Sequence, residues 1–189
     1  APMLTLSQSE STVLESTFDG TGVDGPSGTA INAGGSQATV WGCIIRNWEY
    51  GMGLGGSAQT VSNNLLANNS VGIRVTVIRS QTTLLADNTF AGNRYGIRLD
   101  KSAQAGQLEI RSSNFVNSAE YHVVASNGLA TVLASGNYWG ATTTSEIEAL
   151  IYDKSDDFTL GQVFFEPFLT SPSITAPSGG PDLALTMEA

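Results

Sequence analysis

Three stretches of the chain decide the fold: VSNNLLANNSVGIRV (Val61 to Val75), LADNTFAGNRYGIRL (Leu85 to Leu99) and IRSSNFVNSAEYHVV (Ile110 to Val124). They share one pattern of apolar, Asn and Gly positions. This pattern recurs about six times between Val13 and Trp139, with roughly two dozen residues in each copy. Such a period is typical of stacked units that are too small to bury their own apolar faces alone.

Each copy has an interior anchor, an aromatic or aliphatic residue that we expect to point into a shared core. The predicted anchors are Phe18, Ile45, Leu66, Phe90, Phe115 and Tyr138. Five positions before each anchor stands another apolar residue: Val13, Val40, Val61, Leu85, Ile110 and Leu133. Two positions before each anchor stands a small or polar residue: Ser16, Cys43, Asn64, Asn88, Ser113 and Gly136.

The second half of each copy reads as a strand. In Ile73-Arg74-Val75 and Ile97-Arg98-Leu99, apolar and polar residues alternate with the two-residue period of a strand. Asn and Gly between the strands suit tight corners, because they tolerate left-handed backbone angles. No copy contains a helical run long enough for a βαβ unit. The pattern therefore predicts a parallel β-solenoid.

The chain resembles the right-handed parallel β-helix proteins of the pectate-lyase-like superfamily over about residues 13–169. Asn64 and Asn88 stand where such proteins often stack an internal ladder, which Ser, Cys and Gly in the other copies would make partial. The ending, from Asn137-Tyr138-Trp139-Gly140 onward, is similar to their terminal coil and cap. The resemblance implies an all-β fold, a right-handed parallel β-helix of about six coils with a short C-terminal capping helix and an extended tail.

We expect four segments: an extended N-terminal piece (1–12), the coils (13–140), a cap (141–169) and a Pro/Gly/Ser-rich tail (170–189). Ser145-Glu146-Ile147-Glu148 reads as a capping box and predicts a short helix over 146–152. In the tail, Asp182 to Met187 alternates weakly and could add as a strand to a neighbouring copy. The alternative is a tail folded back on its own rod.

The composition of the chain limits the classes of partner that it can bind. The net charge is −9 with eight Lys and Arg residues, so no basic stripe exists to neutralise the phosphates of a nucleic acid. No apolar run is long enough to span a membrane. The single cysteine, Cys43, allows no disulfide within the chain and is expected in the core. The chain begins Ala1-Pro2-Met3, which suggests a mature product or a trimmed fragment, and we expect a secreted or cell-surface protein.

Catalytic motifs are weak. His122 is the only histidine, no G-x-S-x-G elbow is present, and we expect His122 at a coil corner or partly buried. The sequence contains no cluster of His and Cys residues that would predict a zinc site. The acidic run Asp153-Lys154-Ser155-Asp156-Asp157 lacks the spacing of a calcium-binding loop. The repeats hold no adjacent carboxylates for glycoside hydrolysis. We predict no catalytic residue, metal or cofactor.

One outer-face feature suggests binding. Arg74 and Arg98 occupy equivalent positions of successive copies, so their backbones should lie about 4.8 Å apart. Two like charges at that separation repel by roughly 1 kcal/mol in water. Asp100 or Glu120 could neutralise them, and so could an acidic sugar stacked on Tyr95. The plainer interpretation is a solvated face.

Three functions stay open. The favoured one is a non-catalytic structural or cell-surface rod, whose copies associate end to end into a filament. The second is a carbohydrate-binding module for an acidic polysaccharide. The third is a polysaccharide lyase or hydrolase of the pectate-lyase-like type, which the missing catalytic set disfavours.

Overall fold

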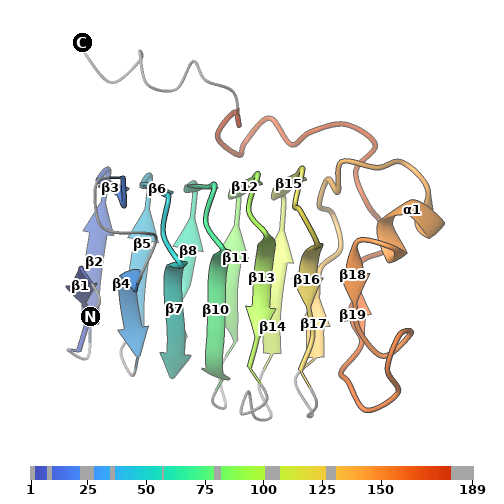
Figure 1. Cartoon of the computed structure of the whole chain (residues 1–189), viewed down its shortest axis with the longest axis horizontal. Helices are drawn as coiled ribbons and strands as arrows, with labels where there is room; N and C mark the ends of the chain where they lie inside the picture. Colours follow the sequence, from blue (N-terminus) through green and yellow to red (C-terminus); the bar gives the residue numbers. More distant parts are fainter. Residues whose placement is uncertain are drawn as a thin grey trace.

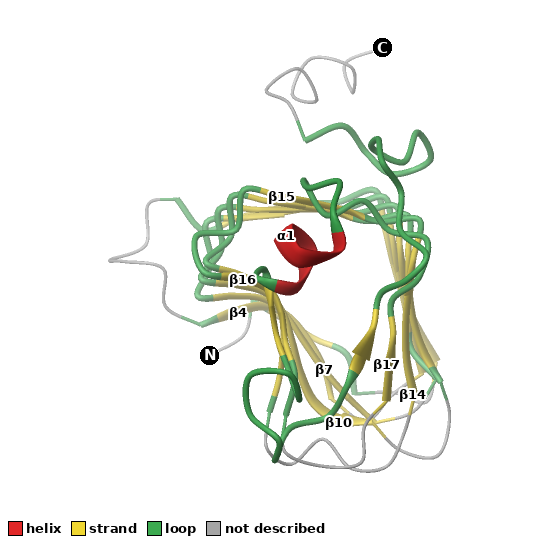
Figure 2. Ribbon diagram, turned by 90° about the vertical axis from the view of Figure 1, so that its right-hand side faces the viewer, coloured by secondary structure: helices red, strands yellow, loops and turns green. Residues whose placement is uncertain are grey.

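The computed structural model describes residues 3–7, 10–21, 28–34, 37–56, 58–78, 82–100, 107–126 and 131–179. They form a parallel β-solenoid whose strands stack into three sheets along one axis (Figure 1). Figure 2 looks along this axis and shows the sheets as walls around a narrow interior, with the single described helix lying across one end. None of the described helices is long and apolar enough to cross a membrane.

Each wall is one sheet. Sheet A contains β1 (Leu4–Thr5), β4 (Thr29–Gly34), β7 (Tyr50–Gly56), β10 (Val71–Ile78), β13 (Tyr95–Leu99), β16 (Tyr121–Val124) and β18 (Ile151–Tyr152). Sheet B contains β2 (Glu10–Leu14), β5 (Gln37–Trp41), β8 (Thr60–Ser62), β11 (Thr83–Ala86), β14 (Gln107–Arg111), β17 (Thr131–Leu133) and β19 (Val163–Phe164). Sheet C contains β3 (Thr17–Asp19), β6 (Ile44–Arg46), β9 (Leu65–Ala67), β12 (Thr89–Ala91) and β15 (Asn114–Val116).

Five successive coils each supply one strand to every sheet, and a less regular sixth supplies β17 and β18. The prediction of a parallel β-helix is therefore confirmed. The pairing begins with β1, inside the segment that the sequence assigned to the N-terminal piece.

The predicted anchors stack as one spine through the first five coils. Phe90 pairs with Phe115 in register, and their rings stack with centroids 4.7 Å apart. Both side chains are fully buried, as are Ile45 and Leu66. The apolar residues five positions earlier form a second buried column on sheet B. Like side chains thus lie above like, as the sequence predicts.

The predicted register of the sixth coil is wrong by one residue. Trp139, not Tyr138, continues the spine: its buried ring stacks on Phe115 with centroids 4.6 Å apart. Tyr138 pairs instead with Asn114, and Leu133 pairs with Glu109. The large flat indole covers more of the Phe115 ring at the end of the aromatic stack than a phenol ring would. Consequently the columns end in Ala134 and Asn137 rather than in Leu133 and Gly136.

Because Asn137 takes this place, the internal ladder is more complete than predicted. The Asn64 and Asn137 side chains accept hydrogen bonds from the backbone N–H of Cys43 and Ser113 at 2.9 Å each. Asn88 Oδ1 likewise accepts from Asn64 N at 3.0 Å. A second ladder, which the sequence analysis missed, is built at the next corner by Asn69 and Asn93.

The corners confirm the expectation of left-handed backbone. One corner residue of each coil has a positive φ: Glu15, Gly42, Asn63, Asp87, Ser112 and Gly136. The backbone N–H of each of the first five donates to a carbonyl of the following coil, so the corners form a stacked column. Only two of the six are glycine, and the others carry the strain of a side chain in this region.

The C-terminal cap contains the predicted helix at shifted bounds. Helix α1 spans Thr144–Glu148, and its capping box is made by Thr143 and Glu146 rather than by Ser145 and Glu148. The helix ends early because Ile151–Tyr152 pairs with β16 as strand β18. Ile147 is the buried residue of the helix and packs on the core.

The described part of the tail, residues 170–179, lies on the outer face of sheet C. Asn114 Oδ1 accepts from Ser173 N at 2.7 Å, and its Nδ2 donates to Ser173 O at 3.1 Å. Thr89 Oγ1 donates to the carbonyl of Pro177, and Thr175 to Asp87. These contacts match the fold-back alternative for residues 170–179. The predicted strand Asp182–Met187 lies outside the described residues.

Candidate functional site

The two arginines singled out by the sequence lie side by side on the outer face of sheet A. Arg74 of β10 pairs in register with Arg98 of β13. Arg74 donates from Nε and Nη2 to Asp100 Oδ2, at 2.9 and 2.6 Å. The hydrogen bond to Asp100 raises the pKa of Arg74. The carboxylate thus offsets one of the two like charges, and all three predicted site residues come together.

Arg98 forms no ion pair with any residue that the structure describes. Its guanidinium carbon lies 5.7 Å from the ring centroid of Tyr95, and Arg94 lies 5.1 Å from the same ring. Arg94 in turn pairs with Glu120, which also accepts from the Tyr95 hydroxyl. These two hydrogen bonds lower the pKa of Glu120. The Arg98 cation therefore keeps hydrogen-bonding capacity for a ligand.

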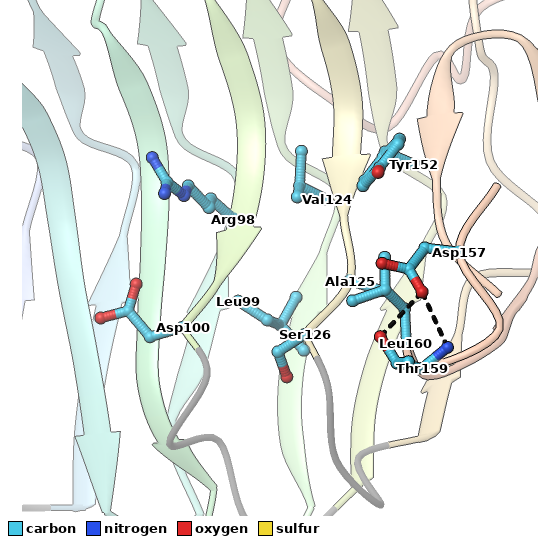
Figure 3. A pocket seen from close by; sticks show the side chains of 10 residues that line it. All are labelled: Arg98, Leu99, Asp100, Val124, Ala125, Ser126, Tyr152, Asp157, Thr159 and Leu160. Atoms are coloured by element: carbon cyan, nitrogen blue, oxygen red, sulfur yellow. Dashed lines mark hydrogen bonds between the residues drawn. The ribbon is translucent and has the colours of Figure 1, made fainter.

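A pocket of about 570 Å³ opens beside Arg98, where sheet A meets the cap (Figure 3). Its lining comes from β13, β16, β18 and the loop that follows β18: Arg98, Leu99, Asp100, Val124, Ala125, Ser126, Tyr152, Asp157, Thr159 and Leu160. Figure 3 shows Arg98 and Asp100 on one side and Asp157 with Thr159 on the other. The pocket combines an apolar floor with charged groups of both signs.

The far wall of the pocket is the loop Asp153–Gln162, which a buried carboxylate holds in shape. Asp153 is 3% exposed and accepts from Ser155 N, Gln162 Nε2 and Val163 N at 2.8 to 2.9 Å. Gly161 N donates to Ser126 O at 2.8 Å and ties the loop to the end of β16. The acidic run from Asp153 to Asp157 therefore forms part of a pocket wall that Asp153 holds in place. Among the described residues no group of three His, Cys, Asp or Glu is placed to hold a metal.

Ser126 is the unusual member of the pocket. The residue is 4% exposed, and its Oγ has no hydrogen-bond partner in the described chain. The other such atom, Trp139 Nε1, belongs to the core spine. Buried hydroxyls without a hydrogen-bond partner are rare because they lower the stability of the fold, so the Ser126 hydroxyl is a candidate for a hydrogen bond to a ligand. Ser126 could not be singled out from the sequence, because Ser126-Asn127-Gly128 has the composition of an ordinary corner.

Asp157 lines the side of the pocket opposite Arg98, and one of its carboxylate oxygens is already used. Its Oδ1 accepts from the backbone and hydroxyl of Thr159, at 2.9 and 2.8 Å. These hydrogen bonds lower the pKa of Asp157, so the side chain is a carboxylate at neutral pH. Its second oxygen remains available as an acceptor at the pocket wall.

His122 takes no part in this site and occupies the core rather than a corner. Its ring lies beside Phe115 and Trp139, with Nε2 3.0 Å from Trp139 O and Nδ1 2.7 Å from Ser118 Oγ. Since a carbonyl only accepts, Nε2 carries the proton. Burial lowers the pKa of His122 to about 4. Cys43 is buried as predicted, and burial raises the pKa of its thiol.

Comparison with known proteins gives one match. A family described as right-handed β-helix region matches residues 4–139. No curated protein matches the chain, and no solved structure does. The matched region contains the five regular coils and the site residues from Arg74 to Ser126, whereas Tyr152, Asp157 and Thr159 follow it.

Proposed function

The chain belongs to the right-handed β-helix family, and from that premise we propose that it is a secreted or surface-exposed, non-catalytic module that binds an acidic saccharide on sheet A. One fold of this kind hosts many activities, so the proposal rests on the site and not on the fold. The observation that carries it is the Arg98 guanidinium, which forms no ion pair with any described residue, beside a pocket lined by Ser126, whose buried hydroxyl has no partner within the described part of the chain.

The chemistry of the pocket suits a sugar acid. A guanidinium binds a carboxylate through two parallel hydrogen bonds, which Arg98 can supply. The Tyr152 ring and the aliphatic floor offer an apolar surface to the carbon face of a sugar ring. Ser126 and Asp157 provide a hydroxyl and a carboxylate for sugar hydroxyl groups. The number and polarity of these side chains suit a polyhydroxylated acid better than an apolar ligand.

Calorimetric titration with oligogalacturonate, and with a neutral glucan as its uncharged counterpart, tests the proposal. We expect the acid to bind and Arg98→Ala to weaken it by about tenfold or more, since a charge-assisted hydrogen bond contributes about 1.5–3 kcal/mol. Arg111→Ala is the matched control, because Arg111 is an exposed arginine on sheet B. Absence of binding to any saccharide on a glycan array contradicts the proposal. Release of unsaturated uronate products by the protein would favour the lyase alternative instead.

A second candidate is a structural rod that associates through its N-terminal end. Strands β1, β2 and β3 are the first strands of their sheets, whereas β18, β19 and α1 lie at the other end. An edge strand is a template for pairing with another chain. Leu14 on β2 is 54% exposed. Light scattering that shows assemblies of the parent chain, dispersed by Leu14→Lys, would support this role, and a monomer at all concentrations would exclude it.

A further inference from the structure

Residues 170–179, the strap, follow one register row on the outer face of sheet C. This row crosses the five strands of the sheet and consists of Asn114, Thr89, Leu65, Ile44 and Thr17. At the fifth coil the Asn114 side chain bonds both the N–H and the carbonyl of Ser173. At the fourth coil Thr89 donates to the carbonyl of Pro177. The strap therefore runs from the cap toward the N-terminal end of the rod, as Figure 1 shows.

An apolar pocket of about 280 Å³ continues the row beyond the strap. Its lining includes Trp41 and Ile44 of the second coil, Leu65 of the third, and Pro177 of the strap itself. Trp41 is 39% exposed, and Leu14, its register neighbour on β2, is 54% exposed. An indole and a leucine side chain exposed beside an apolar pocket form a surface of the kind that another segment commonly covers.

The row and the chain that lies on it change polarity in the same order. Under the strap the row presents the polar side chains of Asn114 and Thr89, which bond the strap backbone. The next two coils present Leu65 and Ile44. The strap is rich in Ser and Thr, whereas the residues that follow it include three apolar side chains at alternate positions: Leu183, Leu185 and Met187. Alternate side chains of an extended segment share one face.

The remaining length of chain is sufficient to reach the pocket. Residues 180–189 lie outside the described part of the structure, and Gly179 lies beside Thr89 and Ala91 on the fourth coil. Two strand spacings, about 10 Å, separate this coil from the second coil, which carries Trp41. Four extended residues span roughly 13 Å, so the leucine at position 183 can arrive at the pocket.

We propose that the segment Asp182–Met187 docks in this groove of its own chain, with Leu183, Leu185 and Met187 packed against the pocket. The inference goes beyond saccharide binding on sheet A and does not depend on it. The occupant is the same chain because its strap already enters the pocket through Pro177. The docked segment then covers apolar surface close to β2, the first strand of sheet B, which is otherwise open to a second copy.

Quenching of tryptophan fluorescence by acrylamide in the full chain tests this docking. Trp48 and Trp139 are 7% and 0% exposed, so the readily quenched emission comes from Trp41. In the parent protein the docked segment should shield Trp41. In Leu183→Ser/Leu185→Ser we expect a higher quenching constant and an emission maximum at longer wavelength, because the indole returns to water.

The matched control is Ala184→Ser/Thr186→Ser, which changes the two alternate positions that face away from the groove. Its quenching constant should equal that of the parent. Equal quenching in the parent and in Leu183→Ser/Leu185→Ser overturns the proposal. Shielding that disappears on dilution, together with dissociation seen by light scattering, also overturns it, because the occupant is then a second copy.

Limited digestion with chymotrypsin, followed by mass spectrometry, tests the groove from its other side. Trp41→Ala should release the segment and speed cleavage after Leu183 and Leu185. Arg111→Ala is the control, because Arg111 occupies the same outer register row of sheet B three coils away. Equal cleavage rates in the parent and Trp41→Ala contradict docking in this groove.

Discussion

At the residue scale, His122 couples stability to pH. The ring is neutral in the folded protein, where burial lowers its pKa from 6.5 to about 4. The unfolded chain therefore binds a proton that the folded chain excludes when the pH lies between these values. As pH falls from 6.5 through 4, we expect the free energy of unfolding to decrease by up to about 3 kcal/mol, at roughly 1.4 kcal/mol per pKa unit.

Urea denaturation at several pH values checks this. In His122→Phe, which keeps an aromatic ring beside Phe115 and Trp139, the loss between pH 6.5 and 4 should be smaller by the same amount. Carboxylates with a lowered pKa also make the free energy of unfolding depend on pH, and they do so equally in both proteins. Asp19 is one of them, and the main cause of its lowered pKa is the hydrogen bond from the Asn47 side chain. Equal slopes in parent and variant would show that His122 does not carry the effect.

A second residue-scale prediction concerns the left-handed corners. Ser112 has φ 51°, and its backbone N–H donates to Gly136 O. Ser112→Gly should raise the free energy of unfolding by roughly 0.5–1 kcal/mol, because relief of a strain of about 1–2 kcal/mol exceeds the entropy cost of glycine. Its neighbour gives the control: Ser113→Gly should destabilise, since Ser113 Oγ accepts from Asn88 N at 3.1 Å. Thermal unfolding compares the two, and a destabilised Ser112→Gly contradicts the argument.

At the scale of elements, the asparagine ladder joins neighbouring coils at their corners. Asn88 donates to Val61 O and accepts from Asn64 N, so Asn88→Ala leaves two buried backbone groups unpaired. We expect a loss of roughly 2–5 kcal/mol, since each group costs about 1–3 kcal/mol. Asn68→Gly is the control, because Asn68 is an exposed corner residue with positive φ. Equal stability of parent and Asn88→Ala in urea would refute the structural role of the ladder.

The strap of residues 170–179 covers sheet C in its own molecule. Deleting residues 170–189 uncovers Asn114 and Thr89, which are otherwise buried on the outer face. We expect a lower melting temperature with no change in assembly state by light scattering. A change of assembly state on deletion would instead support the hypothesis that the tail joins neighbouring copies.

The sequence predicted elements whose determinants lie within one repeat. Phe90 and Phe115 stack because each copy places an anchor at the same distance from its corner, and that distance is visible in the sequence. The register of the sixth coil was predicted wrongly because Tyr138 and Trp139 are adjacent aromatic residues and either could be the anchor. Only the packing against Phe115 decides between them. The first turn of α1 was misplaced for a similar reason, since Thr143 and Ser145 both satisfy the capping pattern.

The candidate site divides in the same way. Arg74 lies on one repeat, and Arg98 and Asp100 lie on the next, so the repeat register predicts that they are neighbours. Ser126 and Asp157 lie outside the regular pattern, and they line one pocket only because the loop after β18 folds back. The path of this loop cannot be predicted from the repeat register, because it is set by the Asp153 side chain and by main-chain hydrogen bonds.

At the scale of the whole molecule, the third and fourth coils correspond residue for residue. The bonds between Asn64 and Asn88, and between Asn69 and Asn93, each span 24 positions. These two coils therefore place equivalent corner asparagines at the same positions of their repeats. We expect a tandem duplication of this 24-residue unit to lengthen the rod by one strand spacing, about 4.8 Å. Duplications of this kind would set the length of the rod in whole steps, while the coils and cap that line the pocket keep their own sequence.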